Sequence, residues 1–252
     1  MTLAKSLTTA LMTCALLGAA DSKTVDKTLP LPSTGSVSIE THNGSVTVNT
    51  WDRPEIQIHA VIEMNSGFGS SDADRRRFSD TRVNIIGSGD TVSIKSEYPP
   101  SNWTNGANPE IHYTISAPRT ARWSVRTHNS RVAVHDLHAA LSVTTHNGQI
   151  DVSGLAGALD LDTHNGQVRV QFASLTGASS VDTHDGDVEL VMPAASRLNL
   201  QTSAHNGRVQ SDFAVSTRNI GRRDAHVDGA VNGGGPTLRL TTHNGNFRLR
   251  AS

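Results

Sequence analysis

The chain has 252 residues, a length that suits one domain or two small ones. Its 22 lysines and arginines nearly balance its 23 aspartates and glutamates, so a net charge of −1 gives no overall attraction to nucleic acid or to an anionic membrane. Aromatic residues make up only 4% of the chain, so valine, leucine, isoleucine and threonine must supply the core, a choice that favours β-structure.

Residues 1–20 have the pattern of a signal peptide, which would leave one β-repeat domain at residues 21–252. Lys5 gives a positive start, residues 7–20 are apolar or small, and Gly18 and Ala20 fit the −3 and −1 positions of a cleavage site. No later segment reaches about 18 uninterrupted apolar residues. We therefore expect an exported protein, periplasmic, extracellular or on the cell surface, whose mature chain has no transmembrane segment.

The single cysteine, Cys14, lies inside the apolar part of this segment. A lipid-anchored cysteine should end the apolar stretch, whereas six more apolar or small residues follow Cys14, and Thr13 fits a lipoprotein signal poorly. We expect Cys14 not to carry a lipid. The mature chain would then have no cysteine for a disulfide, a thiolate nucleophile or a metal site.

A repeat centred on Thr-His-Asn-Gly dominates the rest of the sequence. Successive histidines of the motif are 86, 18, 18, 20, 21 and 38 residues apart, and the last interval equals two periods of 19. A period of 18–21 residues is typical of the coils of a solenoid. The motif histidines are His42, His128, His146, His164, His184, His205 and His243.

Apolar and polar residues alternate on both sides of each motif. In one repeat, Val143, Thr145, Ile150 and Val152 take the apolar positions, and polar residues such as Gln149 stand between them. A period of two indicates strands that are buried on one face. We expect a core of valine, leucine and isoleucine with one threonine per repeat, and charged residues on the other face.

The Asn-Gly pair predicts a sharp bend, because asparagine tolerates a positive φ and glycine adopts it without steric cost. Asn129-Ser130 lacks the glycine, so that coil should be strained or bent differently. Two all-β architectures fit the pattern: a single β-solenoid of stacked strand–turn–strand coils, or an antiparallel meander of Asn-Gly hairpins. The constant period and the identical side chains at equivalent positions favour the solenoid, since stacking rewards ladders of like residues.

The ordered set of motifs resembles a known bacterial family, the putative adhesins, which are exported β-strand-repeat domains of unknown function. The resemblance covers residues 29–251 and is carried by VSIETHNGSVTVNTWDRPEIQIHAVIE, IHYTISAPRTARWSVRTHNSRVAVHDL, LSVTTHNGQIDVSGL, LDLDTHNGQVRVQFA and LRLTTHNGNFRLRAS. It implies a β-helical exported domain without established catalytic residues. The word adhesin is itself an analogy, so the resemblance implies fold and location more firmly than adhesion.

Three loop excursions are predicted to interrupt the repeat, near residues 65–90, 99–109 and 211–236. The first contains glycine and serine, and a short helical turn is predicted at residues 72–80. Arg75, Arg76 and Arg77 lie there, but Asp72 and Asp80 flank them and no set of aromatic residues accompanies them. We therefore interpret this segment as a solvated surface and predict no nucleic-acid partner.

The histidine repeat is the strongest candidate for a functional site. Neighbouring imidazoles at about 5 Å could share Zn²⁺ or Cu²⁺, or could titrate together near pH 6. Because an outward row does not enclose an ion, we expect the rings simply to pack on one another, with no metal and no cofactor. His135 and His138 lie where a strand meets a bend, and the scattered aspartates lack calcium-loop spacing, so neither set predicts a metal site.

Signatures of the common enzyme classes are missing from the sequence: there is no Gly-x-Ser-x-Gly elbow, phosphate-binding glycine loop or His-Glu-x-x-His helix. We predict that the protein is not an enzyme and has no catalytic residues. We expect an interaction or adhesion scaffold instead. Its partner is unknown, and the candidate classes are a cell-surface polymer and an envelope protein. Two other classes stay open: an accessory domain for envelope stress or regulation, and a carbohydrate-active β-helix enzyme with paired acids.

Overall fold

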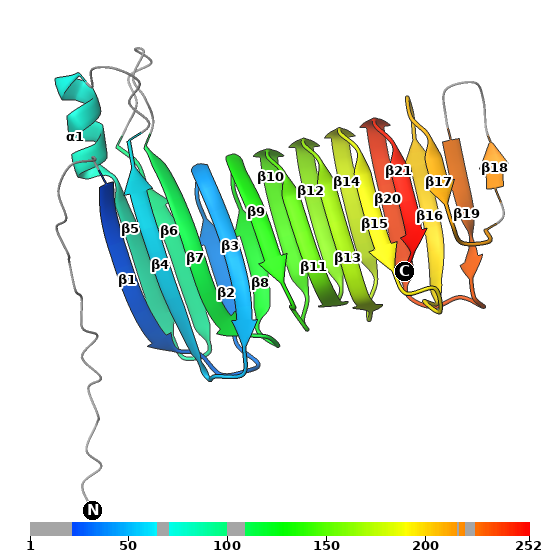
Figure 1. The fold of residues 1–252 in the computed structure, drawn as a ribbon, viewed down its shortest axis with the longest axis horizontal. Helices are drawn as coiled ribbons and strands as arrows, with labels where there is room; N and C mark the ends of the chain where they lie inside the picture. The colour runs from blue at the N-terminus through cyan, green and yellow to red at the C-terminus, as the bar shows by residue number, and fades with distance from the viewer. Residues whose placement is uncertain (1–21, 65–70, 100–108, 216, 220–224) are drawn as a thin grey trace, which may run out of the picture.

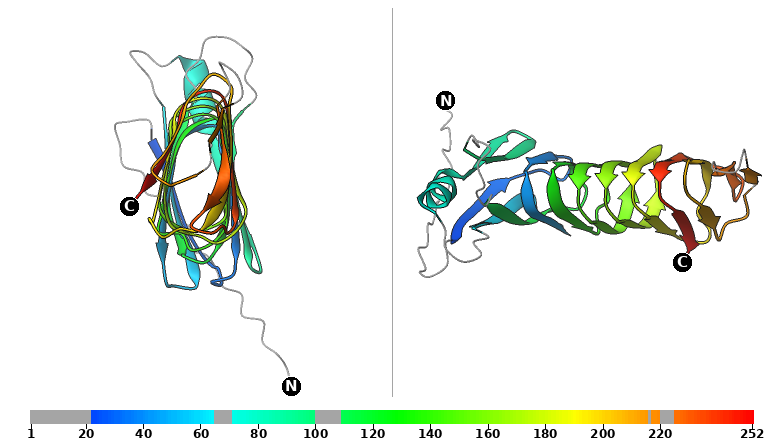
Figure 2. Two further views of the ribbon diagram at one scale, coloured as in Figure 1. Left: turned by 90° about the vertical axis from the view of Figure 1, so that its right-hand side faces the viewer. Right: turned by 90° about the horizontal axis from the view of Figure 1, so that it is seen from above.

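The computed structural model describes residues 22–64, 71–99, 109–215, 217–219 and 225–252. Over these residues the chain forms a long, flattened solenoid in which two sheets face each other across a narrow core (Figures 1 and 2). Coils follow one another along the long axis, and the view down that axis shows the flattened cross-section (Figure 2). The expected signal peptide, residues 1–20, lies outside the described residues.

One sheet carries the motif histidines at the ends of its strands. Its strands, in spatial order, are β5 (Arg82–Ser88), β6 (Thr91–Glu97), β2 (Ser36–Glu40), β8 (Arg122–Arg126), β10 (Leu141–Asn147), β12 (Leu159–Asn165), β14 (Ser179–Asp185), β20 (Thr237–Asn244), β16 (Leu198–Ala204), β19 (Ala225–Val231) and β18 (Thr217–Asn219).

The second sheet closes the other side of the core. Its strands, in spatial order, are β1 (Ser22–Pro30), β4 (Glu55–Glu63), β7 (Glu110–Pro118), β3 (Asn43–Trp51), β9 (Asn129–His135), β11 (Ile150–Gly157), β13 (Val168–Leu175), β15 (Val188–Met192), β21 (Phe247–Ala251) and β17 (Val209–Ser211).

The regular coils confirm the predicted solenoid and exclude the hairpin meander. Strand β10 pairs in parallel with β8 and β12, and β11 pairs in parallel with β9 and β13. Equivalent residues align, so that Val143 lies opposite Leu161 and Thr145 lies opposite Thr163. The Asn-Gly bend therefore passes the chain from one sheet to the other instead of closing a hairpin.

The alternating pattern places the predicted side chains in the core. Val143, Ile150 and Val152 are at most 1% exposed, whereas Gln149 is exposed. The threonine before each histidine also faces inward, as in Thr145 and Thr163. β-Branched and leucine side chains thus form columns along both sheets. Each coil covers the apolar side chains of the coils next to it, and the two sheets cover each other across the core.

Glycine is needed at the bend mainly because the backbones of stacked coils approach closely. A Cβ at Gly166 would lie 1.9 Å from the carbonyl oxygen of Gly148, and one at Gly148 would lie 2.1 Å from that of Ser130. The motif asparagines do not adopt a positive φ; among described residues other than glycine, only Asp136 and Asn232 do. The expectation that asparagine supplies the bend through positive φ was therefore wrong.

Ser130 shows how the coil without a motif glycine is accommodated. Its φ is not positive, and its side chain is buried at 2% exposure beside Gly44 of the preceding coil. This bend therefore differs from those at Gly44, Gly148, Gly166 and Gly186, where the glycine has a positive φ.

The spatial order of the coils departs from their order in the sequence at two places. The coil of β20 and β21 lies between the coil of β14 and β15 and the coil of β16 and β17. Near the other end, β2 and β3 lie between β6 and β7 on one side and β8 and β9 on the other. The 38-residue histidine interval therefore contains an antiparallel detour through β18 and β19, followed by insertion of the last coil (Figure 1).

The described parts of two excursions lie at opposite ends of the solenoid, with residues 72–80 at one end and β18 and β19 at the other (Figure 1). The helical turn predicted near residues 72–80 is confirmed as helix α1 (Asp72–Asp80), whose capping box joins Ser71 and Asp74. Residues 211–236, predicted to form a loop, contain the strands β18 and β19, so that prediction was wrong in part. Most of the excursion at residues 99–109 lies outside the described residues. Within the described part of the chain, no helix is long and apolar enough to cross a membrane.

Candidate functional site: the histidine face

The motif histidines form one continuous row along the edge of the first sheet, which we call the histidine row. Neighbouring ring centroids are 4.6–4.9 Å apart over all six steps. The rings of His128 and His146 are nearly parallel, at 2°, whereas those of His164 and His184 meet edge to face, at 63°. The spatial order of the row is His42, His128, His146, His164, His184, His243 and His205.

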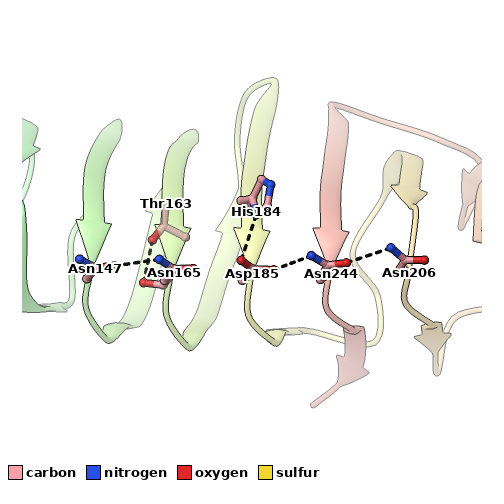
Figure 3. A network of polar contacts seen from close by, with 7 residues as sticks. All are labelled: Asn147, Thr163, Asn165, His184, Asp185, Asn206 and Asn244. Atoms are coloured by element: carbon pink, nitrogen blue, oxygen red, sulfur yellow. Dashed lines mark hydrogen bonds and ion pairs between the residues drawn. The ribbon is translucent and has the colours of Figure 1, made fainter.

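A second row, the asparagine row, lies at the bend beside the histidines. Asn129 Nδ2 donates to Asn43 Oδ1 at 3.1 Å, Asn147 donates to Asn129 at 2.8 Å, and the side-chain amides of Asn147 and Asn165 lie 2.9 Å apart. Figure 3 shows the continuation of the row, in which Asp185 replaces asparagine. There Asn244 donates to Asp185 at 2.7 Å and Asn206 donates to Asn244 at 2.9 Å.

The asparagine row explains why the bends stack in register. Each side-chain amide has both donors and an acceptor, so it can bond to the coils above and below it. Asp185 can only accept, and it accepts from Asn244 and from His184, whose Nδ1 lies 3.0 Å from Asp185 Oδ2. The hydrogen bonds with Asn244 and with His184 lower the pKa of the Asp185 carboxyl.

The histidine face also contains polar columns next to the row. Asp162 lies opposite Asp182 across β12 and β14, two residues before His164 and His184 along each strand. An open groove of about 430 Å³ follows these side chains and reaches Thr241, His243 and His205. The groove offers a histidine at each step, whereas the neighbouring column changes from Asp182 to Thr241 and then to Ser203.

Burial and neighbouring rings lower the pKa of one histidine of the row, His128. Partial burial, followed by the neighbouring His42 and His146, lowers the pKa of the His128 imidazole below its ordinary value of 6.5. His128 therefore stays neutral to a lower pH than a free histidine, because protonation would place a charge between two other rings.

The other residues weighed as metal ligands do not converge. His135 Nδ1 is 2.8 Å from Ser153 Oγ, and His138 is exposed at the following bend. Asp160 accepts from Ser180, and Asp187 accepts from Asn246. Within the described ranges, no group of three or more histidine, cysteine, aspartate or glutamate side chains is placed to hold a metal ion.

The opposite face of the solenoid has a different chemistry. Asp151, Arg169, Glu189 and Arg248 occupy one column in successive strands, so opposite charges alternate. Arg169 lies 3.6 Å from Glu189, and Arg250 lies 2.7 Å from the same carboxylate. Arg169 and Arg250 thus both pair with Glu189.

A second groove was not predicted from the sequence. It has a volume of about 550 Å³ and lies over β20, β16 and β19, with His226, Asp228 and Arg239 in its lining. His226 and Asp228 belong to the segment that was expected to be a loop, and neither obeys the repeat. No motif in the sequence could have marked them, since the groove depends on β19 pairing with β16.

Comparisons with known proteins place the chain in a family. The family described as Toastrack DUF4097 matches residues 2–250. Among solved structures, a putative cell adhesion protein from Clostridium sporogenes is 8% identical over 90% of this chain and 99% of its own, with a TM-score of 0.43. A putative adhesin from Bacteroides fragilis is 12% identical over 91% of this chain and 97% of its own, with a TM-score of 0.37. No curated protein matches the chain.

Proposed function

Because the chain belongs to the Toastrack DUF4097 family, we propose that it is a non-catalytic scaffold of the cell envelope or cell surface that binds an extended polymer along its histidine face. One observation carries this proposal: seven equivalent histidines repeat every 4.6–4.9 Å beside the asparagine row. A surface of this kind presents an imidazole at each step. A polymer with a matching repeat could therefore bind at many weak contacts at once.

Two further observations support binding without catalysis. The groove beside the histidine row is open along its length, so it does not exclude water from a bound ligand as a catalytic cleft does. The paired carboxylates Asp162 and Asp182 sit on neighbouring strands of one column, between Thr144 and Thr241, and line the same open groove.

Sedimentation with insoluble polymers tests this proposal. The full chain is mixed with cell-wall sacculi, cellulose or chitin, and the bound fraction is measured after centrifugation. The double variant His146→Ser with His164→Ser should lose most of the binding, because it interrupts the row at its centre. The matched control, Gln149→Ser with Gln167→Ser, changes two exposed residues outside the histidine row and should bind as the native chain does. Equal loss in both variants would contradict the assignment of the binding face.

We also propose that the protein is exported and that residues 1–20 are removed. If residues 1–20 are a signal peptide, the protein recovered from the envelope or medium of an expressing bacterium should begin at Asp21. Amino-terminal sequencing measures this directly. Recovery of the protein with Met1 intact, or with a lipid on Cys14, would contradict the proposed processing.

A further inference from the structure

We infer that the groove over β20, β16 and β19 is a binding site for a neutral saccharide. This inference deepens the proposed function, because it names a ligand class for one end of the same face. The groove has a volume of about 550 Å³, which lies within the range of small-molecule sites. It arises where the regular stack ends and an antiparallel strand begins.

The antiparallel strand β19 opens this part of the sheet. On β16, Thr202 has no backbone ladder partner in β19, and three side chains make the connection instead. Asp228 Oδ1 accepts from the Thr202 amide at 3.2 Å, and His226 Nδ1 lies 3.0 Å from the Thr202 carbonyl oxygen. The Thr202 hydroxyl accepts from the Val227 amide at 2.7 Å and donates to the Val227 carbonyl oxygen at 3.2 Å.

These contacts fix the orientation of the groups that face the groove. Since a carbonyl oxygen only accepts, Nδ1 of His226 must donate, which leaves Nε2 of the neutral ring as an acceptor. The carboxylate of Asp228 is held through one oxygen, so its second oxygen can still accept. The nearby Gly229 and Ala230 have little or no side chain, so the floor of the groove stays low.

The polar groups form two rows across the three strands. In the first row, Arg239, Gln201 and Asp228 are neighbours, and Arg239 Nη2 donates to Gln201 Oε1 at 3.3 Å. In the second row, Thr241 and Ser203 lie side by side on β20 and β16, and His226 completes the lining. The site thus combines a cation, an amide, a carboxylate, two hydroxyls and an imidazole.

The charges of this array select a neutral ligand with many hydroxyls. In the described part of the chain no ion pair joins Arg239 and Asp228, which stand on opposite sides of Gln201. An anionic ligand would be attracted by Arg239 but repelled by Asp228, and a cationic ligand the reverse, so a net charge on the ligand brings no advantage. A sugar hydroxyl both donates and accepts, so adjacent hydroxyls can bond to the guanidinium and to the carboxylate together.

Saturation-transfer NMR and titration of the full chain test this site. The probes are maltotriose, cellotriose and triacetylchitotriose, with trigalacturonate and the zwitterionic dipeptide glycylglycine as charged comparators. At least one neutral trisaccharide should bind saturably, and both comparators should bind more weakly. Failure of all three trisaccharides, or preference for a charged comparator, would overturn the inference.

Two variants locate the site. Asp228→Asn and Arg239→Gln should each weaken binding of the trisaccharide about tenfold or more. Arg248→Gln, on the other face of the inserted coil, should leave binding unchanged. Because Asp228 also bonds to Thr202, Gln201→Ala serves as a further variant, and thermal unfolding confirms that each variant is folded. Native-like binding by folded groove variants would overturn the site.

The same variants separate this inference from the proposed function. If the groove variants lose trisaccharide binding but still sediment with the polymer that the native chain binds, the saccharide site stands apart from the histidine row. If the native chain sediments with a polymer but binds no trisaccharide, the saccharide site fails and the proposed function stands.

Discussion

At the scale of single residues, the direction in which a side chain points decides what a substitution costs. Val168 is 2% exposed in β13, and the adjacent Gln167 is exposed at the preceding bend. Val168→Asp should prevent folding, because an unpaired charge would enter a narrow core at a cost of several kcal/mol. Gln167→Lys should change the free energy of unfolding by no more than about 0.5 kcal/mol. Circular dichroism and urea unfolding measure both, and similar behaviour of the two variants would contradict the assignment of faces.

The backbone of the neighbouring coil leaves no space for a side chain at motif glycines such as Gly166. Gly166→Ala would place a methyl group 1.9 Å from the carbonyl oxygen of Gly148, an atom that cannot move without shifting its whole coil. We expect a loss of well over about 1 kcal/mol in the free energy of unfolding. Gly177→Ala is the matched control, since the nearest atom to its new methyl group is Cβ of Ala158 at 3.2 Å. The control should lose clearly less stability than Gly166→Ala.

At the scale of the elements, the histidine row links stability to pH. The pKa of His128 is lowered in the folded protein, so the unfolded chain binds more protons as the pH falls. The contribution of His128 to stability is therefore complete above its ordinary pKa of 6.5 and is lost as the pH falls through the lower folded value. Two neighbouring protonated rings also repel by about 1 kcal/mol, even at the dielectric constant of water.

Urea unfolding between pH 7.5 and pH 5 measures this effect. We expect the free energy of unfolding to fall on acidification over this range, and the fall to be smaller in His128→Gln. His138→Gln is the control, because His138 lies at a different bend, outside the histidine row. An identical pH dependence in the native chain and in His128→Gln would show that protonation of His128 does not change the free energy of unfolding.

At the scale of the whole molecule, the inserted coil of β20 and β21 holds together the two coils on either side of it. Strands β20 and β21 pair in parallel with β14 and β15 on one side and with β16 and β17 on the other. They bury Leu238, Leu240, Phe247 and Leu249, which are at most 1% exposed. The coil therefore joins two parts of the solenoid that the sequence order would place next to each other.

Removal of residues 236–252 should open the stack at this position and lower the midpoint of thermal unfolding. A synthetic peptide of residues 236–252 should bind to the shortened chain and raise the midpoint again, because it restores both sets of parallel pairings. The same peptide with Leu240→Asp is the control and should have no effect. A shortened chain as stable as the native one would show that the neighbouring coils close the gap themselves.

The sequence by itself determined the parts of this protein that are periodic. The motif spacing and the alternation of side chains predicted strand–turn–strand coils, their buried columns and the row of histidines, because each coil repeats the same local requirements. The Thr-His-Asn-Gly unit also identified the bend, although glycine acts there through close backbone contact and asparagine through its side-chain amide.

Only the tertiary structure decided the order of the coils and the position of the groove over β20, β16 and β19. All coils carry nearly the same ladder residues, so local pattern cannot tell which neighbour the coil of His243 will join. The groove brings His226 and Asp228 beside Arg239 through an antiparallel pairing between segments that share no motif. Pairing between distant segments depends on the whole stack, and for that reason no single repeat contains the information.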